Sequence, residues 1–423
     1  MKNKLNYIDL FAGAGGLSEG FKRAGFEPIA HVEMMEAACF TMRTRSTYYH
    51  LKENGFESKY HAYLRDDITR GELYRDIPKE ILDAVIHAPI GKATNDAIFQ
   101  QIDQNLNGIK EVDLIIGGPP CQAYSLVGRA RSENNMKSDS RNFLYVQYAE
   151  YLQRYQPKMF VFENVIGLKS AGEGIYLKHM EKLFKKKGYS IELFTVNARD
   201  FGVLQNRRRV IIIGWKMDSI PNLPDLGNLK TDNKTQVGRL FDDLPELQAG
   251  EGVEKFRRYE KKADEYLYNC HIRNGIDIVT QHVARPHTDQ DLEIYRIAVD
   301  KWKNKQERLN YNDLPSRLQT HKNRKSFFDR FKVVADDLEY SQTVVAHIAK
   351  DGHYYIHPDI TQNRSLTVRE AARLQSFPDD FYFEGASTRG QRTAAFTQIG
   401  NAVPPLMAYS IANLINELLC QRT

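Results

Sequence analysis

Short hydrophobic runs alternate with amphipathic stretches along the first half of the chain. Apolar runs typical of buried strands lie at residues 5–11, 28–32, 112–116, 159–162, 191–196 and 210–214. Apolar positions at helical spacing lie between them, at residues 17–24, 143–155 and 175–187. Strands that alternate with helices predict an α/β fold, in which a mostly parallel sheet carries helices on its faces.

The pattern changes after about residue 215. Three prolines between residues 221 and 245 interrupt the chain, and the polar, charge-rich tract 251–337 shows little strand periodicity. A chain of 423 residues also exceeds the ~250–300 at which one hydrophobic core stops growing. We therefore expect a large domain of residues 1–230 and 400–423, a smaller irregular domain of residues 231–365, and a hinge of residues 366–399.

Helical spacing returns near the C-terminus. At residues 365–377 a helix would begin at Ser365 or Thr367, whose hydroxyls suit a helix N-cap, with Glu370 in its first turn. Residues 404–419 place leucines and isoleucines on one helical face. We expect this last helix to return to the large domain and pack on it.

Composition narrows the setting in which the protein works. The mean hydropathy is −0.54, and no uninterrupted apolar stretch approaches the ~18 residues of a membrane span. The four cysteines, Cys39, Cys121, Cys270 and Cys420, are too few and too scattered for a disulfide framework or a metal site. We therefore expect a cytoplasmic protein with neither a membrane nor a metal partner.

One of these cysteines stands out by its position. Cys121 lies in the segment Gly117–Gln122, directly behind the buried run 112–116. Ligands of open α/β sheets bind at the carboxyl ends of the strands, and Pro119 and Pro120 fix the backbone of this loop. The position suggests a nucleophile, although a buried structural cysteine is the commoner fate of a free thiol.

A glycine turn follows the first predicted strand. Gly13, Gly15 and Gly16 let the backbone approach a nucleoside-type ligand closely, but Ser18 stands where a dinucleotide fingerprint would have its third glycine. A nicotinamide coenzyme is therefore disfavoured. Glu33 ends the second predicted strand, where a carboxylate can bind ribose hydroxyls.

Six segments together resemble the signature blocks of the cytosine-C5 DNA methyltransferases, in the same order. They are Asp9–Gly16, Gly117–Gln122, Glu163–Val165, Gln205–Arg209, Thr367–Gln375 and Gln398–Pro405. The resemblance covers residues 7 to about 415, except for 70–110 and roughly 231–335, and several independent blocks in one order make it specific. It implies a Rossmann-like S-adenosylmethionine-dependent methyltransferase with a smaller, irregular target-recognition domain. Enzymes of this family in bacterial restriction–modification systems protect host DNA from a cognate endonuclease.

The chemistry of cytosine explains the residue types in these blocks. Carbon 5 becomes nucleophilic only after a thiolate adds to carbon 6, and we assign Cys121 to that step. The addition needs a proton donor at N3, and Glu163, at the end of an apolar strand, fits this role. Arg207 and Arg209 alternate along a strand-like run, so we expect both on one face. The resemblance gives these two arginines and Gln205 supporting roles toward the cytosine, the carboxylate and a phosphate of the DNA.

The resemblance also implies S-adenosylmethionine as the methyl donor. Its expected contacts are Phe11 on the adenine, Gly13, Gly15 and Gly16 around the methionine portion, Glu33 on the ribose, Asp67 and Ile68 at the adenine edge, and Leu144, Asn401, Ala402 and Val403 completing the pocket. One departure lies at Asp66, where the family usually has glycine. Residues 70–110 also exceed the usual spacing, and we expect a surface excursion there.

Double-stranded DNA is the expected partner, bound by a monomer. Because a duplex hides carbon 6, the base must leave the helix, and residues 128–141 read as a mobile loop that closes over DNA. Ser125 and Arg129 would fill the vacated space. The basic, aromatic tract 320–332, with Lys322, Arg324 and Lys325, suits a phosphate backbone. A solvated helix face with a core-facing aromatic stripe is the alternative for this tract.

Three other functions remain as alternatives. An RNA cytosine-C5 methyltransferase would not need so large a variable region. A non-catalytic DNA-binding regulator would have no physical reason to keep Cys121, Glu163, Arg207 and Arg209 together. A nicotinamide oxidoreductase has no role for a Pro-Pro-Cys loop. We therefore predict a sequence-specific DNA methyltransferase that acts near the nucleoid.

Overall fold

A seven-stranded sheet forms the centre of the protein. The computed structural model describes residues 4–120, 143–217, 225–231, 233–252, 256–387 and 390–420. The strands run in the order β3-β2-β1-β4-β5-β7-β6, and β7 is antiparallel to both of its neighbours whereas β1 to β5 are parallel. Their bounds are β1 Asn6–Leu10, β2 Glu27–Glu33, β3 Val85–His87, β4 Leu114–Gly117, β5 Met159–Val165, β6 Tyr189–Asn197 and β7 Arg208–Lys216. The predicted Rossmann-like, mostly parallel sheet is confirmed.

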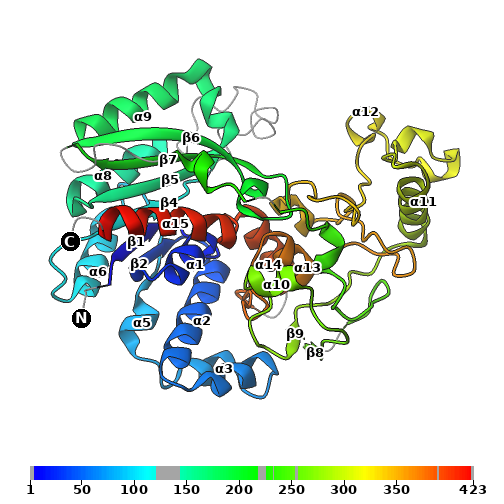
Figure 1. Ribbon diagram of the computed structural model, residues 1–423, viewed down its shortest axis with the longest axis horizontal. Helices are drawn as coiled ribbons and strands as arrows, with labels where there is room; N and C mark the ends of the chain where they lie inside the picture. The colour runs from blue at the N-terminus through cyan, green and yellow to red at the C-terminus, as the bar shows by residue number, and fades with distance from the viewer. Residues whose placement is uncertain are drawn as a thin grey trace.

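Helices cover both faces of this sheet because neighbouring strand residues point to opposite sides. On β4, Ile116 packs with α1 (Gly16–Arg23) and α15 (Pro405–Cys420) in one core cluster. The adjacent Ile115 packs in a second cluster with α8 (Leu144–Tyr155) and α9 (Ile175–Lys186) on the other face. The last helix therefore returns to the large domain, as the sequence predicted, and the two ends of the chain lie close together (Figure 1).

The expected surface excursion at residues 70–110 is wrong. This segment supplies β3, which pairs with β2 at the edge of the sheet, and α6 (Asn95–Leu106). Ile86 of β3 and Ile98 and Ile102 of α6 are buried in the second core cluster. The strand escaped sequence analysis because it is three residues long, too short for a periodic pattern to emerge.

A helical lobe connects β2 to β3. It contains α2 (Glu36–Glu53), α3 (Glu57–Leu64), α4 (Arg70–Tyr74) and α5 (Lys79–Asp83). Tyr60, Leu64 and Leu73 of this lobe share a hydrophobic cluster with Ile276 and Ile278. Figure 1 shows α3 at the far end of the lobe from the sheet, on the same side as strands β8 (Phe256–Arg258) and β9 (Ile278–Thr280). The lobe therefore connects the sheet to the second half of the chain.

The second half is irregular, as expected. It contains the two-stranded β8-β9 ribbon, α10 (Glu265–Asn269), α11 (Asp289–Lys305) and α12 (Arg324–Phe327). Ile294, Tyr295 and Val299 of α11 form a small core with Tyr311 and Phe331. Figure 1 shows α11 and α12 together at the end of the molecule farthest from the sheet. The exact domain boundaries at residues 230, 365 and 400 stay predictions.

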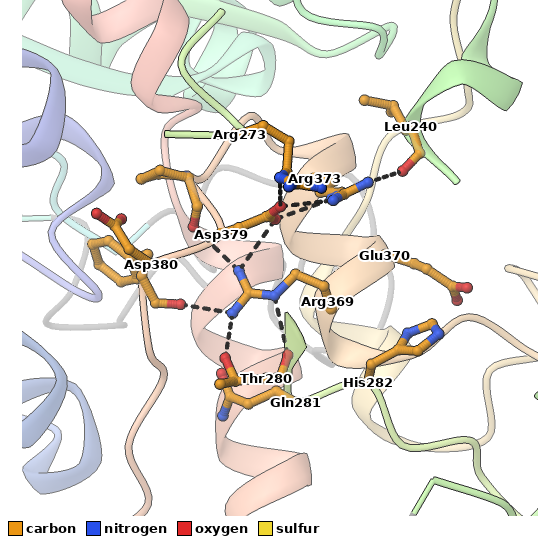
Figure 2. A network of polar contacts seen from close by, with 12 residues as sticks. Leu240, Arg273, Thr280, Gln281, His282, Arg369, Glu370, Arg373, Asp379 and Asp380 are labelled. Atoms are coloured by element: carbon orange, nitrogen blue, oxygen red, sulfur yellow. Dashed lines mark hydrogen bonds and ion pairs between the residues drawn. The ribbon is translucent and has the colours of Figure 1, made fainter. Parts of the chain in front are cut away.

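Buried ion pairs surround α13 (Val368–Leu374), and Figure 2 shows Arg369 and Arg373 of this helix among their polar partners. In Figure 1, α13 lies between the sheet and α11. Thr367 is its N-cap, because its hydroxyl accepts from the Glu370 N–H at 3.2 Å while the Glu370 carboxylate accepts from the Thr367 N–H at 2.7 Å. Arg373 donates to Asp379 at 2.6 Å and to Asp243 at 2.5 Å. The helix therefore ties residues of the irregular domain to the segment that follows it.

Two features are absent from the residues that the structure describes. No helix in this part of the chain has the length and apolar character to cross a membrane. Within the same residues, no group of three or more His, Cys, Asp or Glu side chains could hold a metal ion.

Candidate active site

Several predicted site residues directly follow the parallel strands. Leu10 of β1 pairs with Val32 of β2 and with Gly117 of β4, and Gly117 pairs with Phe162 of β5. The residues that follow these positions therefore meet along one edge of the sheet. In α/β folds this edge is where ligands bind.

The glycine turn and Glu33 are in direct contact. Gly13 has a φ of +55° and donates its N–H to Glu33 Oε2 at 2.8 Å, while Met35 donates its N–H to Oε1 at 2.7 Å. Burial raises the pKa of the Glu33 carboxyl above its usual range, and these backbone donors partly offset the rise. A side chain at Gly13 would meet no atom of the described residues within 4 Å, so these residues leave open space beside the turn.

The predicted C-terminal part of the cofactor site lies against the same turn. A Cβ added to Gly16 would lie 2.2 Å from the Val403 carbonyl oxygen and 3.2 Å from Ala402 Cβ, so only glycine fits there. Asn401 ends α14 (Gln391–Asn401) and is exposed. Two other predicted contacts, Phe11 after β1 and Leu144 at the start of α8, are half-buried. The structure thus places Ala402 and Val403 against the glycine turn. The contacts of all five residues with a cofactor stay predictions.

The assignment of Asp67 and Ile68 to this pocket is wrong. Asp67 is exposed, and Ile68 packs in the hydrophobic cluster of the helical lobe with α2, α3 and β9. The segment that lies beside Glu33 instead follows β3, because Ala88 donates its N–H to the Glu33 carbonyl oxygen at 2.9 Å. Ile90, two residues later, is buried. The sequence suggested Asp67 and Ile68 because this dipeptide resembles the family block. The three residues of β3 are too few to show a strand pattern, so the segment after β3 was not recognised.

Glu163 and Arg209 form an ion pair at the end of β5. Arg209 Nε lies 2.8 Å from Glu163 Oε1, and the two side chains are only 13% and 12% exposed. Arg209 lies on β7 opposite Val165, two positions from Glu163, so the pair is a diagonal cross-strand contact. The attraction between opposite charges is stronger in such a partly dry setting than in water, and it holds the carboxylate in place.

The loop that leads to Cys121 begins beside this ion pair. A Cβ on Gly118 would lie 2.8 Å from Glu163 Oε2, and Asn164 Nδ2 donates to the Pro119 carbonyl oxygen at 3.2 Å. Both contacts bring the Gly-Gly-Pro-Pro segment against the end of β5. Cys121, Ser125, Arg129 and the predicted loop 128–141 lie outside the described residues, and their roles stay predictions.

Arg207 does not share the position of Arg209, contrary to expectation. Its guanidinium is buried and donates to the carbonyl oxygens of Val344 at 2.7 Å, Gly400 at 3.1 Å and Ala402 at 2.8 Å. β7 begins only at Arg208, so the strand alternation assumed for this run does not extend to Arg207. Arg207 therefore joins its own segment to Val344 and to residues 400–402, and it supports the site indirectly.

Gln205 is also buried, so the predicted contact with DNA is wrong. Its side chain is 0% exposed; it donates to the Leu374 carbonyl oxygen at 2.9 Å and accepts from the Val344 N–H at 2.9 Å. Gln205 forms an isolated bridge with Ser341. Its role in the structure is to join the irregular domain to the end of α13.

Aromatic rings of the basic tract pack inward, as the alternative reading of this tract expects. Phe331 is buried in the small core of α11, and His321 stacks on Phe327 with ring centroids 3.9 Å apart. These rings therefore belong to the core-facing stripe. Three predicted DNA contacts on the other side of the tract, Lys322, Arg324 and Lys325, are exposed on and before α12. Their binding to DNA stays a prediction.

Comparison with known proteins gives the family. A model of the C-5 cytosine-specific DNA methylases matches residues 5–66 and 86–417, so the break falls on the segment of α4 and α5. The Type II methyltransferase M.Bpa9945I of Bacillus paralicheniformis is 41% identical over 446 residues, which cover 97% of this chain and 98% of that protein. M1.HphI of Haemophilus parahaemolyticus, also named a Type II methyltransferase, is 32% identical over 98% of this chain and 87% of its own.

Solved structures agree on the fold. A prophage-encoded protein of E. coli has a TM-score of 0.63 and 23% identity over 98% of this chain and 99% of its own. EhMeth, a methyltransferase of Entamoeba histolytica, has a TM-score of 0.57 and 14% identity over 99% of both chains. Because the family model spans most of the sequence, the chain belongs to the C-5 cytosine-specific DNA methylases and is a DNA (cytosine-5) methyltransferase.

Proposed function

We propose that this enzyme methylates one cytosine within a specific duplex sequence, through a covalent bond between Cys121 Sγ and carbon 6 of the base. The observation that supports this most is the Arg209–Glu163 ion pair beside the loop that leads to Cys121. It sets a fixed carboxyl group beside the segment that leads to the candidate nucleophile. Nucleophile and proton donor are the two groups that addition to cytosine requires.

The two oxygens of the Glu163 carboxyl have different neighbours, which supports its role. Oε1 pairs with Arg209, whereas Oε2 lies toward Gly118 and the start of the loop. Arg209 therefore orients the group and leaves the second oxygen for the substrate. In the proposed reaction this oxygen first takes up a proton from solvent and then passes it to cytosine N3 as the Cys121 thiolate adds to carbon 6. After methyl transfer a base removes the proton on carbon 5, the bond between Cys121 and carbon 6 breaks, and the carboxylate takes the N3 proton back.

The residues at the strand ends fit S-adenosylmethionine. Bound there, it would supply an electrophilic methyl group. The space beside Gly13 and the close approach of Gly16 to Val403 form a backbone cradle that a side chain would fill. Each Glu33 oxygen accepts one backbone N–H and keeps lone pairs for the ribose hydroxyls. Ile90, buried behind Ala88, is our candidate for the apolar contact at the adenine edge.

Duplex DNA supplies the physical reason for base extrusion. Carbon 6 is covered by stacking, so the cytosine must leave the helix before Cys121 can reach it. The exposed cations of the α12 region, Lys322, Arg324 and Lys325, suit the phosphates of the flanking DNA. We propose that the irregular domain selects the sequence and that one monomer acts on each site.

Both relatives described above are named as Type II methyltransferases. We propose that this enzyme likewise protects host DNA from a cognate endonuclease.

Bisulfite sequencing of DNA from cells that express the protein tests this function. Wild-type protein should protect one cytosine of one recurring sequence from conversion, and the Cys121→Ala variant should protect none. Equal conversion of every cytosine in both samples would contradict a DNA substrate. Protected cytosines in RNA from the same cells, with none in DNA, would favour the RNA alternative.

A further inference from the structure

A buried ion pair joins the two helices that follow the proposed cofactor edge. α1 begins at Gly16 in the glycine turn and carries Glu19, and α2 begins three residues after Glu33 and carries Arg45. Arg45 Nε donates to Glu19 Oε2 at 2.8 Å, and Nη2 donates to Oε1 at 2.6 Å. Both residues are buried. This two-point bond fixes the distance and the angle between the helices.

A third element meets the same guanidinium. Arg45 Nη1 donates to Asp380 Oδ1 at 2.9 Å. The neighbouring Asp379 turns the other way, to Arg373 of α13, and Figure 2 shows the Asp379 carboxylate among the arginines with Asp380 directed away from them. Each of the three guanidinium nitrogens of Arg45 therefore donates to a carboxylate of another segment.

Aromatic rings enclose this charged group. The Arg45 guanidinium lies 4.3 Å from the ring centroid of Tyr48, 4.8 Å from that of Tyr49 and 5.1 Å from that of Phe381. The Tyr49 hydroxyl also donates to Glu19 Oε1 at 2.9 Å. Removing one partner of such a dry pair leaves an uncompensated buried charge. The neighbouring segments must then move or admit water.

Packing alone does not fix the glycine turn on this side. A cavity of about 370 Å³ lies behind the turn, between α1 and α2, and its lining includes Ala14, Gly15, Ser18, Met42 and Arg45. A void supplies no van der Waals contacts to resist small displacements. Across this void, the Arg45–Glu19 bond connects the helix that follows the turn to the helix that follows Glu33.

We propose that Arg45 is a positioning residue for the cofactor, which sets the spacing between the glycine turn and Glu33 from behind the pocket. Arg45 itself touches no cofactor. Arg45 fixes α1 through its bond to Glu19, and it fixes α2 because it is part of that helix. The proposal rests on S-adenosylmethionine as the cofactor, which is part of the proposed function.

The variant Arg45→Lys tests the proposal because it keeps the positive charge of the side chain. A lysine ammonium is a point charge and cannot reproduce the planar fork that reaches both Glu19 oxygens and Asp380. The chain offers a matched control in Arg364, which donates to the two Glu370 oxygens at the same distances, 2.8 and 2.6 Å, and is also buried. Arg364 lies in the irregular half, away from the cofactor edge.

The readouts are the Kd for S-adenosylhomocysteine, the KM for S-adenosylmethionine, kcat and Tm. We expect Arg45→Lys to raise Kd and KM by about tenfold, the effect of one lost hydrogen bond to a charged group. We expect its kcat at saturating cofactor to stay within about twofold, because the chemical groups are untouched. Arg364→Lys should lower Tm comparably and leave the cofactor Kd unchanged.

Three results overturn the proposal: an unchanged cofactor Kd in Arg45→Lys, an equal rise in both variants, or a large fall in kcat with KM unchanged. If Arg45→Lys does not fold, the milder variant Glu19→Gln replaces it in the test. We expect a smaller rise in the cofactor Kd for Glu19→Gln, and no rise would contradict the proposal. The control for the proposed function is the wild-type protein. If the wild type binds neither compound, the assigned cofactor is wrong; if it binds and the variants bind equally well, only the role of Arg45 is wrong.

Discussion

Arg209 and Glu163 reach each other across two antiparallel strands, with 2.8 Å between Arg209 Nε and Glu163 Oε1. This contact gives the candidate proton donor a fixed orientation at the start of the Cys121 loop. The next residue back along β7, Arg208, is exposed. Two adjacent arginines therefore differ sharply in what they contact, and this difference supplies an internal control.

We predict that Arg209→Met lowers kcat by about 100-fold, the effect seen when one preorganised polar partner of a reacting group is removed. The KM for the cofactor should change little, because Arg209 contacts Glu163 and not the glycine turn. Steady-state methylation of duplex DNA measures both constants. Arg208→Met should behave like the wild type, and a comparable loss in both variants would contradict the assigned role.

Gly118 should not tolerate a side chain. A Cβ there would lie 2.8 Å from Glu163 Oε2, so Gly118→Ala must displace either the carboxylate or the loop. We expect a strong loss of turnover with DNA binding retained. Gly71→Ala is the matched control, because its added Cβ would meet nothing closer than 3.9 Å. Normal turnover in Gly118→Ala would show that Oε2 is not the oxygen that faces the substrate.

Asp67→Ala should leave the Kd for S-adenosylhomocysteine within about twofold of wild type, because Asp67 is exposed on the helical lobe. Glu33→Gln should weaken binding by about tenfold or more, since a charged acceptor for the ribose hydroxyls is lost. Isothermal titration measures both values. If Asp67→Ala weakened binding as much as Glu33→Gln, the correction made from the position of β3 would be wrong.

Stability should fall as the pH drops below about 6.5. Burial lowers the pKa of His282 and of His287 to about 4, and that of His357 to about 3. Each ring is neutral in the folded protein, whereas the unfolded chain takes up a proton near pH 6.5. Each histidine therefore removes about 1.4 kcal/mol of stability per pH unit below that value, until its folded pKa is reached.

Urea unfolding of the full-length protein at pH 7.5 and 5.5 measures this loss. His282→Gln should reduce the difference between the two conditions, because it removes one of the histidines whose pKa is lowered by burial. The ring of His282 lies between the Thr367 hydroxyl and the Pro245 carbonyl oxygen, both of which suit a neutral imidazole. A stability that rises between pH 7.5 and 5.5 would contradict the account.

The predictable part of the fold is the part set by local pattern. β1, β2, β4 and β5 are apolar runs bounded by polar residues, so their existence followed from the sequence. β3 did not, because its three residues carry too short a pattern. The cap of α13 was ambiguous between Ser365 and Thr367, and the reciprocal bonds of Glu370 decide it in favour of Thr367.

Candidate site residues follow the same rule. Glu163 could be found because it follows an apolar run near the carboxyl end of β5, and ligands bind at such strand ends. The burial of Arg207 could not, because its partners Val344 and Gly400 lie 137 and 193 residues away along the chain. Arg45 gave no sequence signal either, since its partner Asp380 lies 335 residues away. Contacts at such separations depend on how the domains come together, which periodicity does not describe.

The central claim is that Cys121 bonds to the target cytosine while the cofactor supplies the methyl group. Duplex DNA that contains 5-fluorocytosine at the target tests it directly, because fluorine at carbon 5 blocks the elimination that would release the enzyme. With S-adenosylmethionine present, mass spectrometry should find a peptide that contains Cys121 linked to a methylated 5-fluorocytosine. A complex linked through another residue, or no covalent complex with DNA that the enzyme methylates in its unmodified form, would contradict the account.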